Sequence, residues 1–328
     1  MYNLRICMAA LAATVASLST TQASAQSFPS RQITIVVAFA VGGPADIIAR
    51  AVAPSLSSQL GRPVNVENRP GANGKLAIQT VLKAPRDGHT FAYISSSIMS
   101  VAPLLDKEFA TMSGEIVPLT TALQTSNAIV VHPSLNVKTV GELVAYAKAN
   151  PGKLFYGSIG EGSWYHFATE KMLSGLGIAA THVAYKGEAP ALQDLVSGSI
   201  QLMIISAAGK SAIDTGKIIP IASTGRDPAV FYPQAPALSS SGIPGVADYD
   251  DTPWVGFGIA TGVPDDIVAT LHAALVTALK SDEVKKRVAV FGDTQTSTID
   301  ELRKKIAAER ASNLSLVTSG RIKLEGSQ

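Results

Sequence analysis

Apolar and polar positions alternate along the first third of the chain in a way that predicts strands and helices in turn. A β-branched run at 33–37 indicates a strand buried on both faces. Apolar residues recur at helical spacing over 47–60 and 77–84, and shorter apolar runs at 64–67 and 90–94 indicate two more strands. Strands and helices in this order are typical of a parallel sheet with right-handed crossovers.

The remaining sequence continues the alternation and predicts an α/β fold throughout. Residues 227–251 are rich in Pro, Ser, Gly and Asp and predict a long loop. Thr139 and Glu142 have the spacing of a capping box at the start of a helix. The predicted strands are 116–123, 127–131, 154–156, 181–184, 201–205, 218–223 and 255–259, and the predicted helices are 139–149, 164–176, 189–196, 265–279 and 299–317.

Two predicted strands lead through glycine-rich loops directly into helices. The first loop, 38–43, ends in a Gly-Gly pair, and Pro44 is a favourable first helical residue because its φ is already fixed. The second loop, 157–163, also contains glycines and precedes the helix at 164–176. Free backbone N–H groups and the positive end of a helix dipole make each loop a candidate anion site. An ordinary turn between a strand and a helix has the same pattern.

The N-terminal residues have the features of a secretory signal peptide over 1–25. Arg5 precedes an apolar, alanine-rich run at 6–18, and the Ala-Ser-Ala sequence at 23–25 suits a cleavage site. The apolar run is short for a membrane span. Cys7, the only cysteine, lies within it, so we expect a mature chain without disulfides or thiol chemistry. Export to the periplasm, with cleavage after about residue 25, follows from this interpretation.

The charge balance does not favour a polyanionic partner. The chain has 27 Lys and Arg against 25 Asp and Glu, and removal of Arg5 leaves 26 against 25, a formal net charge of +1. Such a balance gives no basic footprint for nucleic acid or an anionic membrane surface. Only 16% of the residues are charged, so the apolar content is expected to form a large core.

No set of residues in the sequence predicts catalysis. Residues 207–211 match the end of a P-loop, but the first glycine of that motif falls on Ile204. No serine stands in a Gly-x-Ser-x-Gly elbow, and the five histidines lack the spacing of metal ligands on a helix. His166, just after the second loop, is equally compatible with a pocket and with a structural role. We predict a protein that is not an enzyme, with no cofactor and no metal.

Several sequence blocks, in order along the chain, carry a family resemblance. They are Gly-Gly-Pro-Ala-Asp at 42–46, Glu-Asn-Arg-Pro-Gly at 67–71, Ala-Pro-Arg-Asp-Gly-His-Thr at 84–90, Asn-Pro-Gly-Lys-Leu at 150–154 and Tyr-Lys-Gly at 185–187. In this order they resemble the Bug-type periplasmic receptors of tripartite tricarboxylate transporters.

The resemblance implies a two-lobed, type II periplasmic-binding fold, with two crossover segments between the lobes and a cleft that closes on its ligand. We expect residues 26–125 and 226–328 in the first lobe and 126–225 in the second. The implied function is that of a monomeric receptor. It would bind a small organic acid, either a di- or tricarboxylate or an aromatic carboxylate, and deliver it to a membrane permease. The alternative is a periplasmic sensor that signals to a membrane histidine kinase.

The resemblance also places the ligand between the two loops, which would hold it largely through backbone N–H groups. Phe39 would line the pocket, the serine hydroxyls are secondary candidates, and Asp46 is more compatible with capping its helix than with ligand contact. The candidate ligand-binding residues are Phe39, Ala40, Gly42, Gly43, Ala45, Asp46, Ser95, Ser97, Ser158, Gly160, Gly162, Ser163, His166 and Ser206.

The sequence departs from the family pattern in three places. Ala40 and Val41 stand where prolines are usual, which is expected to change the stiffness of the first loop. Ile205 and Ser206 stand where family members that bind amino acids often have an Asp, which argues against an amino-acid ligand. Trp164 and Tyr165 replace small residues; they would stack on an aromatic acid if they face the cleft, but packing in the core is favoured.

Overall fold

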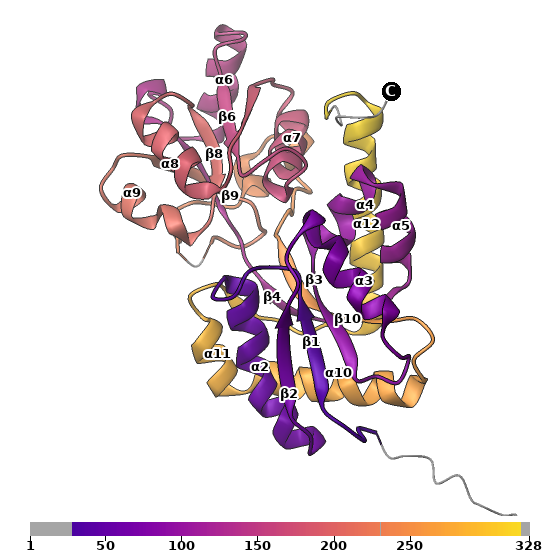
Figure 1. The fold of residues 1–328 in the computed structure, drawn as a ribbon. Coiled ribbons are helices and arrows are strands. Elements are labelled where there is room, and N and C mark those ends of the chain that lie inside the picture. The colour runs from indigo at the N-terminus through magenta and orange to yellow at the C-terminus, as the bar shows by residue number, and fades with distance from the viewer. Residues whose placement is uncertain (1–27, 230, 323–328) are drawn as a thin grey trace, which may run out of the picture.

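The computed structural model describes residues 28–229 and 231–322, which form two lobes with one sheet each (Figure 1). The predicted α/β fold with two lobes is therefore confirmed. The signal peptide predicted at 1–25 lies outside the described residues. None of the helices in the described ranges has the length and apolar character needed to cross a membrane.

The first lobe contains a six-stranded mixed sheet with the order β11-β4-β10-β3-β1-β2. Its three N-terminal strands are parallel, and β10 pairs antiparallel with both β3 and β4. The strands are β1 (Ile33–Val37), β2 (Val64–Asn68), β3 (Thr90–Ser95), β4 (Ile116–Gln124), β10 (Trp254–Ala260) and β11 (Asp293–Thr294). The helices are α2 (Pro44–Leu60), α3 (Lys75–Lys83), the π-helix η2 (Ser97–Val101), α4 (Ala102–Leu105), α5 (Lys107–Gly114), α10 (Asp265–Lys280), α11 (Asp282–Val288) and α12 (Ile299–Thr318), with a short 3-10 turn, η1 (Ala72–Gly74).

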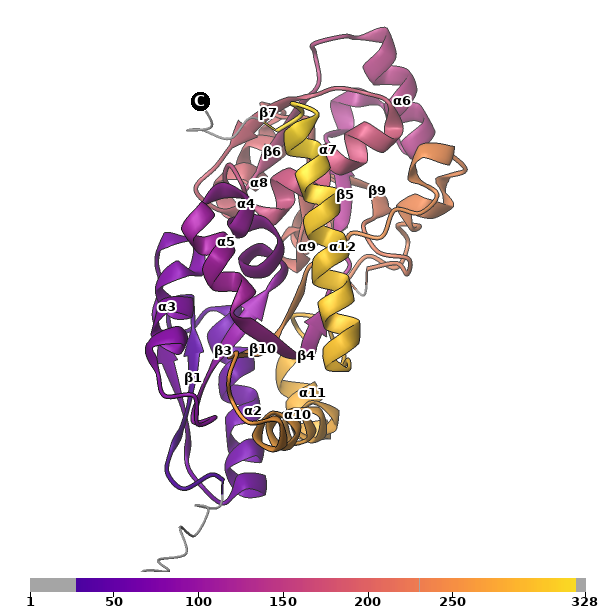
Figure 2. The same cartoon turned by 90° about the vertical axis from the view of Figure 1, so that its right-hand side faces the viewer.

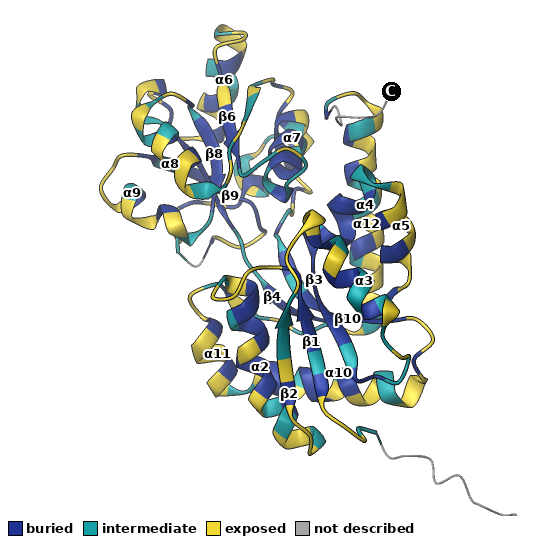
Figure 3. Cartoon of the chain, viewed as in Figure 1, coloured by how far each residue is buried: buried dark blue, intermediate teal, exposed yellow. Residues whose placement is uncertain are grey.

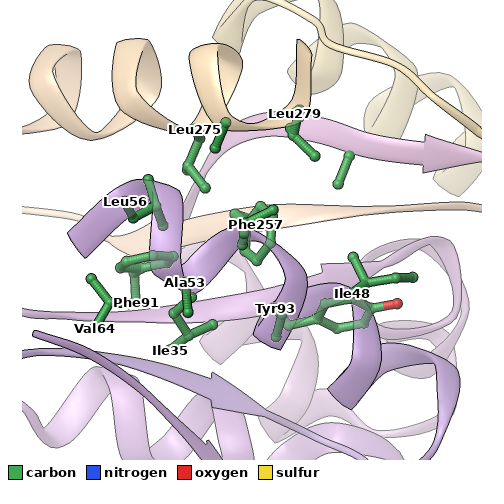
Figure 4. Packing of buried hydrophobic residues seen from close by; sticks show 14 of the residues in the cluster. Ile35, Ile48, Ala53, Leu56, Val64, Phe91, Tyr93, Phe257, Leu275 and Leu279 are labelled. Atoms are coloured by element: carbon green, nitrogen blue, oxygen red, sulfur yellow. The ribbon is translucent and has the colours of Figure 1, made fainter. Parts of the chain in front are cut away.

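Both faces of this sheet are covered, which explains the unbroken apolar runs of its strands. On one face Ile35 packs with helices α2, α10 and α11, and Figure 4 shows Leu56 and Leu275 from two of these helices close to Phe257 of the sheet. On the other face Val36 packs with α3, α5 and α12. The dark-blue strands of Figure 3 show that burial is concentrated in the sheets.

The second lobe contains a five-stranded sheet with the order β7-β6-β8-β5-β9. Its helix α6 begins with the predicted capping box, since both hydrogen bonds between Thr139 and Glu142 are present. The strands are β5 (Ala128–Val131), β6 (Phe155–Ser158), β7 (Thr181–Ala184), β8 (Leu202–Ile205) and β9 (Ile219–Ser223). The helices are α6 (Val140–Ala149), α7 (Trp164–Leu176), α8 (Glu188–Ser197) and α9 (Lys210–Asp214), with 3-10 turns η3 (Pro133–Leu135), η4 (Ala207–Gly209), η5 (Leu238–Ser241) and η6 (Pro244–Val246).

The chain crosses between the lobes twice, in two segments that are hydrogen-bonded to each other. The outward segment, 125–127, joins β4 to β5, and the return segment, 251–253, leads into β10. Thr125 N–H donates to the carbonyl of Pro253 at 3.2 Å, and Thr224 links the pair by donating to Asn127 O at 2.9 Å and accepting from Asp251 N–H at 2.9 Å. We call these two segments the hinge.

The structure corrects the lobe boundary expected at residue 226. Residues 231–249 pack with the second lobe, where Tyr232 and Tyr249 are buried in its two cores. The return to the first lobe therefore comes at the hinge, about 25 residues later than expected from helix and strand patterns alone. The segment forms few regular elements, as its composition predicted, but its apolar residues belong to the second lobe.

Helix α12 provides a further contact between the lobes. It starts on the first lobe and runs toward α7 of the second (Figure 2). Near its end, Phe167 of α7 packs in a buried cluster with Val101, Leu316 and Ile322. Arg321 lies 3.4 Å from Glu170 of α7 as an ion pair. We call this group the strut contact.

Candidate functional site

The cleft between the lobes contains two recesses, each lined by residues of both lobes. The first recess, about 520 Å³, is lined by the first loop, the second loop and the segment that contains Ser97. The second recess, about 330 Å³, lies next to the hinge and is lined by Pro44 and Ile48 of α2 and by residues of the second lobe. Volumes of this size suit small ligands.

The first loop is held by a carboxylate from its own helix. Asp46 accepts a hydrogen bond from Gly42 N–H at 3.0 Å and from Asn68 Nδ2 at 3.0 Å, and it pairs with Arg50 at 2.9 Å. The hydrogen bond from Arg50 lowers the pKa of Asp46 to about 2, against the effect of burial. Asp46 thus holds the loop through Gly42, although the start of the helix, at Gly43, has no side-chain cap hydrogen bond, and the Gly42 N–H predicted for the ligand is already used.

The start of α2 retains unused donors. Gly43, the N-cap, provides no side chain, and its own N–H makes a long 3.4 Å contact with Ala40 O. Pro44 has no N–H. Ala45 and Asp46 are in the first helical turn, where N–H groups have no acceptor within the helix. The predicted anion site therefore reduces, in this loop, to the N–H groups of Ala45 and Asp46.

The second loop differs from the expectation, because the N–H groups predicted to bind the ligand are bonded within the loop. Gly160 N–H donates to Ser158 Oγ at 3.2 Å, Gly162 N–H to His166 Nδ1 at 3.2 Å, and Ser163 N–H to Gly160 O at 3.2 Å. The loop nevertheless forms a wall of the first recess from Ile159 to Ser163.

Two polar candidates lie behind the second loop and line neither recess. Ser158 is fully buried, and its Oγ lies 2.7 Å from His182 Nε2. His166 is buried and stacks on His182 with ring centroids 3.9 Å apart. Burial lowers the pKa of each imidazole to about 4, so both rings are neutral near pH 7. Of the two possibilities for His166, the structure supports the structural role.

The other side-chain candidates are divided between the recesses. Phe39 and Ser97 line the first recess, and Phe39 also contacts Tyr93 edge-on, with centroids 6.1 Å apart. Ser206 lines the second recess. Ser95 is buried and lines neither recess; its Oγ accepts from Ile98 N–H at 3.3 Å.

The two aromatic residues after the second loop have different environments. Trp164 is buried in the core of the second lobe, as favoured, and its Nε1 donates to Asp251 of the hinge at 2.9 Å. Tyr165 lines the second recess instead. One residue thus connects the second loop to the hinge, and the other faces the cleft.

Sequence reasoning missed two polar residues of the second recess. Glu188 is the first residue of α8, and its carboxylate accepts from both the N–H and the hydroxyl of Ser206, each at 2.8 Å. Burial raises the pKa of Glu188. Asn127 lies in the hinge and is only 2% exposed. Glu188 has the sequence context of an ordinary helix start, so no local signal distinguishes it.

The charge of the cleft limits how an anion can be held. Among the described residues that line either recess there is no Lys, Arg or His, and the acidic residues are Glu161 and Glu188. An organic acid would therefore depend on backbone N–H groups and neutral donors. No group of three His, Cys, Asp or Glu side chains in the described ranges is arranged to hold a metal ion.

Comparisons with known proteins agree with this geometry. The model of the tripartite tricarboxylate transporter family receptor matches residues 48–317. Protein BugT of Bordetella pertussis is 30% identical over 293 residues, which cover 87% of this chain and 88% of BugT. Rpa4515 of R. palustris, solved with adipate, is 30% identical with a TM-score of 0.72, covering 90% of this chain and 99% of that one. MatC from Rhodopseudomonas palustris, solved with bound malate, is 26% identical with a TM-score of 0.67, covering 87% and 100%.

Proposed function

Because this chain belongs to the family of tripartite tricarboxylate transporter receptors, we propose that it is an exported periplasmic receptor for a small organic carboxylate, which it delivers to a membrane permease. The observation that carries the proposal is the cleft, where two strand–loop–helix units face each other across recesses of suitable size. Adipate and malate in the related structures support a carboxylate ligand.

The ligand carboxylate would accept hydrogen bonds from the free N–H groups at the start of α2. In the second loop it would compete with the acceptors that the N–H groups already have. The N–H groups of Ala45 and Asp46 have no acceptor within their helix. In the second loop, Gly160 and Gly162 donate to neutral acceptors. A ligand carboxylate forms stronger, charge-assisted hydrogen bonds, so its exchange for those acceptors is favourable.

Closure would couple binding to transport. The hinge consists of two short segments, so rotation of one lobe on the other requires few backbone changes. A ligand that contacts both loops stabilises the closed arrangement by its additional contacts there. The closed receptor then presents to the permease a surface that the open receptor lacks.

A thermal-shift screen of the mature protein tests the ligand class. We expect at least one di- or tricarboxylate, aromatic acid or amino acid to raise the Tm, since a ligand at a hundredfold excess over its Kd stabilises the folded state by about 2.7 kcal/mol. Neutral sugars and simple cations serve as controls. Stabilisation by the controls alone would overturn the proposal.

Uptake by cells tests delivery to a permease. Deletion of the receptor gene is expected to abolish uptake of the labelled acid found in the screen, and a plasmid copy is expected to restore it. Unchanged uptake together with an altered transcriptional response to the acid would instead indicate the sensor that the sequence left as the alternative.

A further inference from the structure

The second recess contains one acidic side chain in a fixed position. Glu188 uses one lone pair of each carboxylate oxygen for Ser206, since Oε1 accepts from the N–H and Oε2 from the hydroxyl. A carboxylate has about four acceptor positions, so acceptor capacity remains for a donor inside the recess. Ser206 thus orients Glu188 as a ready acceptor at the wall of the second lobe.

The same recess contains a donor from the hinge. Asn127 is 2% exposed, and its side-chain amide lies close enough to the Tyr165 hydroxyl to lower the pKa of that group, against the effect of burial. The recess therefore offers a ligand one acceptor, Glu188, and one donor, Asn127.

The rest of the recess is largely apolar, which strengthens the effect of any charge placed there. Ile48 and Tyr93 line it from the first lobe, and Phe231 lines it from the second. In such surroundings a ligand carboxylate beside Glu188 meets a like charge with no basic residue to offset it. An ammonium group would be attracted by the carboxylate and would donate hydrogen bonds to it.

We infer that Glu188 determines specificity by binding an ammonium group, so that the ligand is a small amino-bearing acid whose carboxylate lies at the loops. Pro44, the first residue of α2, and Ile48, one turn later, line this recess, so the start of that helix borders it. One small molecule can then reach both. This inference rests on the proposed carboxylate-binding function and narrows its ligand.

An amino-acid ligand, which the serine at position 206 disfavours, is possible where a neighbouring residue supplies the carboxylate. Position 206 lacks a carboxylate, but Glu188 places one against it from a different element. Glu188 and Ser206 are 18 residues apart in sequence, yet Glu188 Oε2 lies 2.8 Å from Ser206 Oγ.

Matched ligand series provide the test. Dicarboxylic, ω-hydroxy and ω-amino acids of equal chain length, together with the corresponding α-amino acids, are titrated calorimetrically into wild-type protein and into Glu188→Gln. We expect an amino-bearing acid to bind wild type at least tenfold more tightly than its dicarboxylic counterpart. Glu188→Gln should remove that preference. Asp300→Asn, which neutralises an exposed acidic residue that lines neither recess, is the control and should retain it.

Each outcome decides whether Glu188 binds an ammonium group of the ligand. Dicarboxylic or ω-hydroxy acids that bind wild type as tightly as the amino acids overturn the role of Glu188 and leave a carboxylate receptor in place. If Glu188→Gln still binds the amino-bearing acid more tightly than its dicarboxylic counterpart, the role of Glu188 is also overturned and the carboxylate receptor remains. No binding by any acid overturns the receptor function as well. If Glu188→Gln fails to fold, Glu188→Asp replaces it, and the preferred amino ligand should become longer by one methylene.

Discussion

The imidazole rings of His166 and His182 stack with their centroids 3.9 Å apart. Both nitrogen contacts of this pair support the second loop, because His166 Nδ1 accepts from Gly162 N–H and His182 Nε2 lies 2.7 Å from Ser158 Oγ. Two neutral rings can stack in this way. Two protonated rings would repel each other, and His166 could no longer accept a hydrogen bond at Nδ1.

This pair predicts a loss of stability in acid. The pKa of each imidazole falls from 6.5 to about 4 on folding, because burial disfavours the charged form. Between those pH values the unfolded chain binds more protons, so the free energy of unfolding decreases as pH falls from about 6.5 to about 4. We expect the pair to contribute a loss of about 2–4 kcal/mol, measured by urea unfolding across this range.

A double variant isolates that contribution from other titrating groups. His166→Gln with His182→Gln should give a flatter dependence of unfolding free energy on pH between 4 and 6.5. His132→Gln, at a half-exposed position, is the matched control and should keep the wild-type slope. Equal slopes in all three proteins would contradict the prediction.

Substitution of Trp164 is expected to affect mainly the stability of the fold, and substitution of Tyr165 mainly the binding of the ligand. Trp164→Ala removes a buried side chain and its hydrogen bond to Asp251, so we expect a loss of about 3–5 kcal/mol in urea unfolding. Tyr165→Ala should cost less, about 1–2 kcal/mol, because the residue is only partly buried. It should weaken the identified ligand at least fivefold in calorimetry, since Tyr165 lines the second recess. The reverse pattern would show that the two environments are assigned wrongly.

Asp46 is expected to stabilise the first loop above acidic pH. Asp46→Asn loses the charge that pairs with Arg50, and we expect a cost of about 1–3 kcal/mol at pH 7. The pKa of Asp46 is lowered from 3.8 to about 2 on folding, so this contribution is lost as pH falls through that interval. Asp214→Asn removes a similar i,i+4 pair with Lys210 at an exposed site, and should change unfolding free energy by at most about 0.5 kcal/mol.

The strut contact is expected to restrain α7. Ile322→Ala removes a buried side chain from the cluster around Phe167, with an expected cost of about 2 kcal/mol. Amide hydrogen exchange in 167–176 should become faster, whereas exchange in α6, which is outside the contact, should not change. Arg321→Gln tests the ion pair with Glu170 separately and should have the smaller effect. Faster exchange throughout the second lobe would instead indicate general destabilisation.

Local patterns predicted the elements well and the site only in part. The strand, glycine pair and proline at 33–44 are neighbours in sequence, so their physical chemistry was visible without a fold. The internal bonding of the second loop depends on where His166 points, which no spacing reveals. Glu188 and Ser206 are brought together by the packing of α8 against β8. The predicted lobe boundary was wrong for the same reason. The loop-like composition of residues 227–251 does not show which core their apolar side chains join.

The strand order of the first sheet has a consequence for the order in which the lobes form. Strand β10 lies between β3 and β4, yet it follows all five strands of the second sheet along the chain. The strands of the second sheet therefore come from one continuous stretch of sequence. The first sheet is complete only when residues 254–260 pair with strands β3 and β4, which lie far earlier in the chain. Such non-local pairing is slow to form. A nascent chain that ends before Trp254 therefore lacks the strand that joins β3 to β4, so its first sheet is incomplete while the second sheet is already encoded in full.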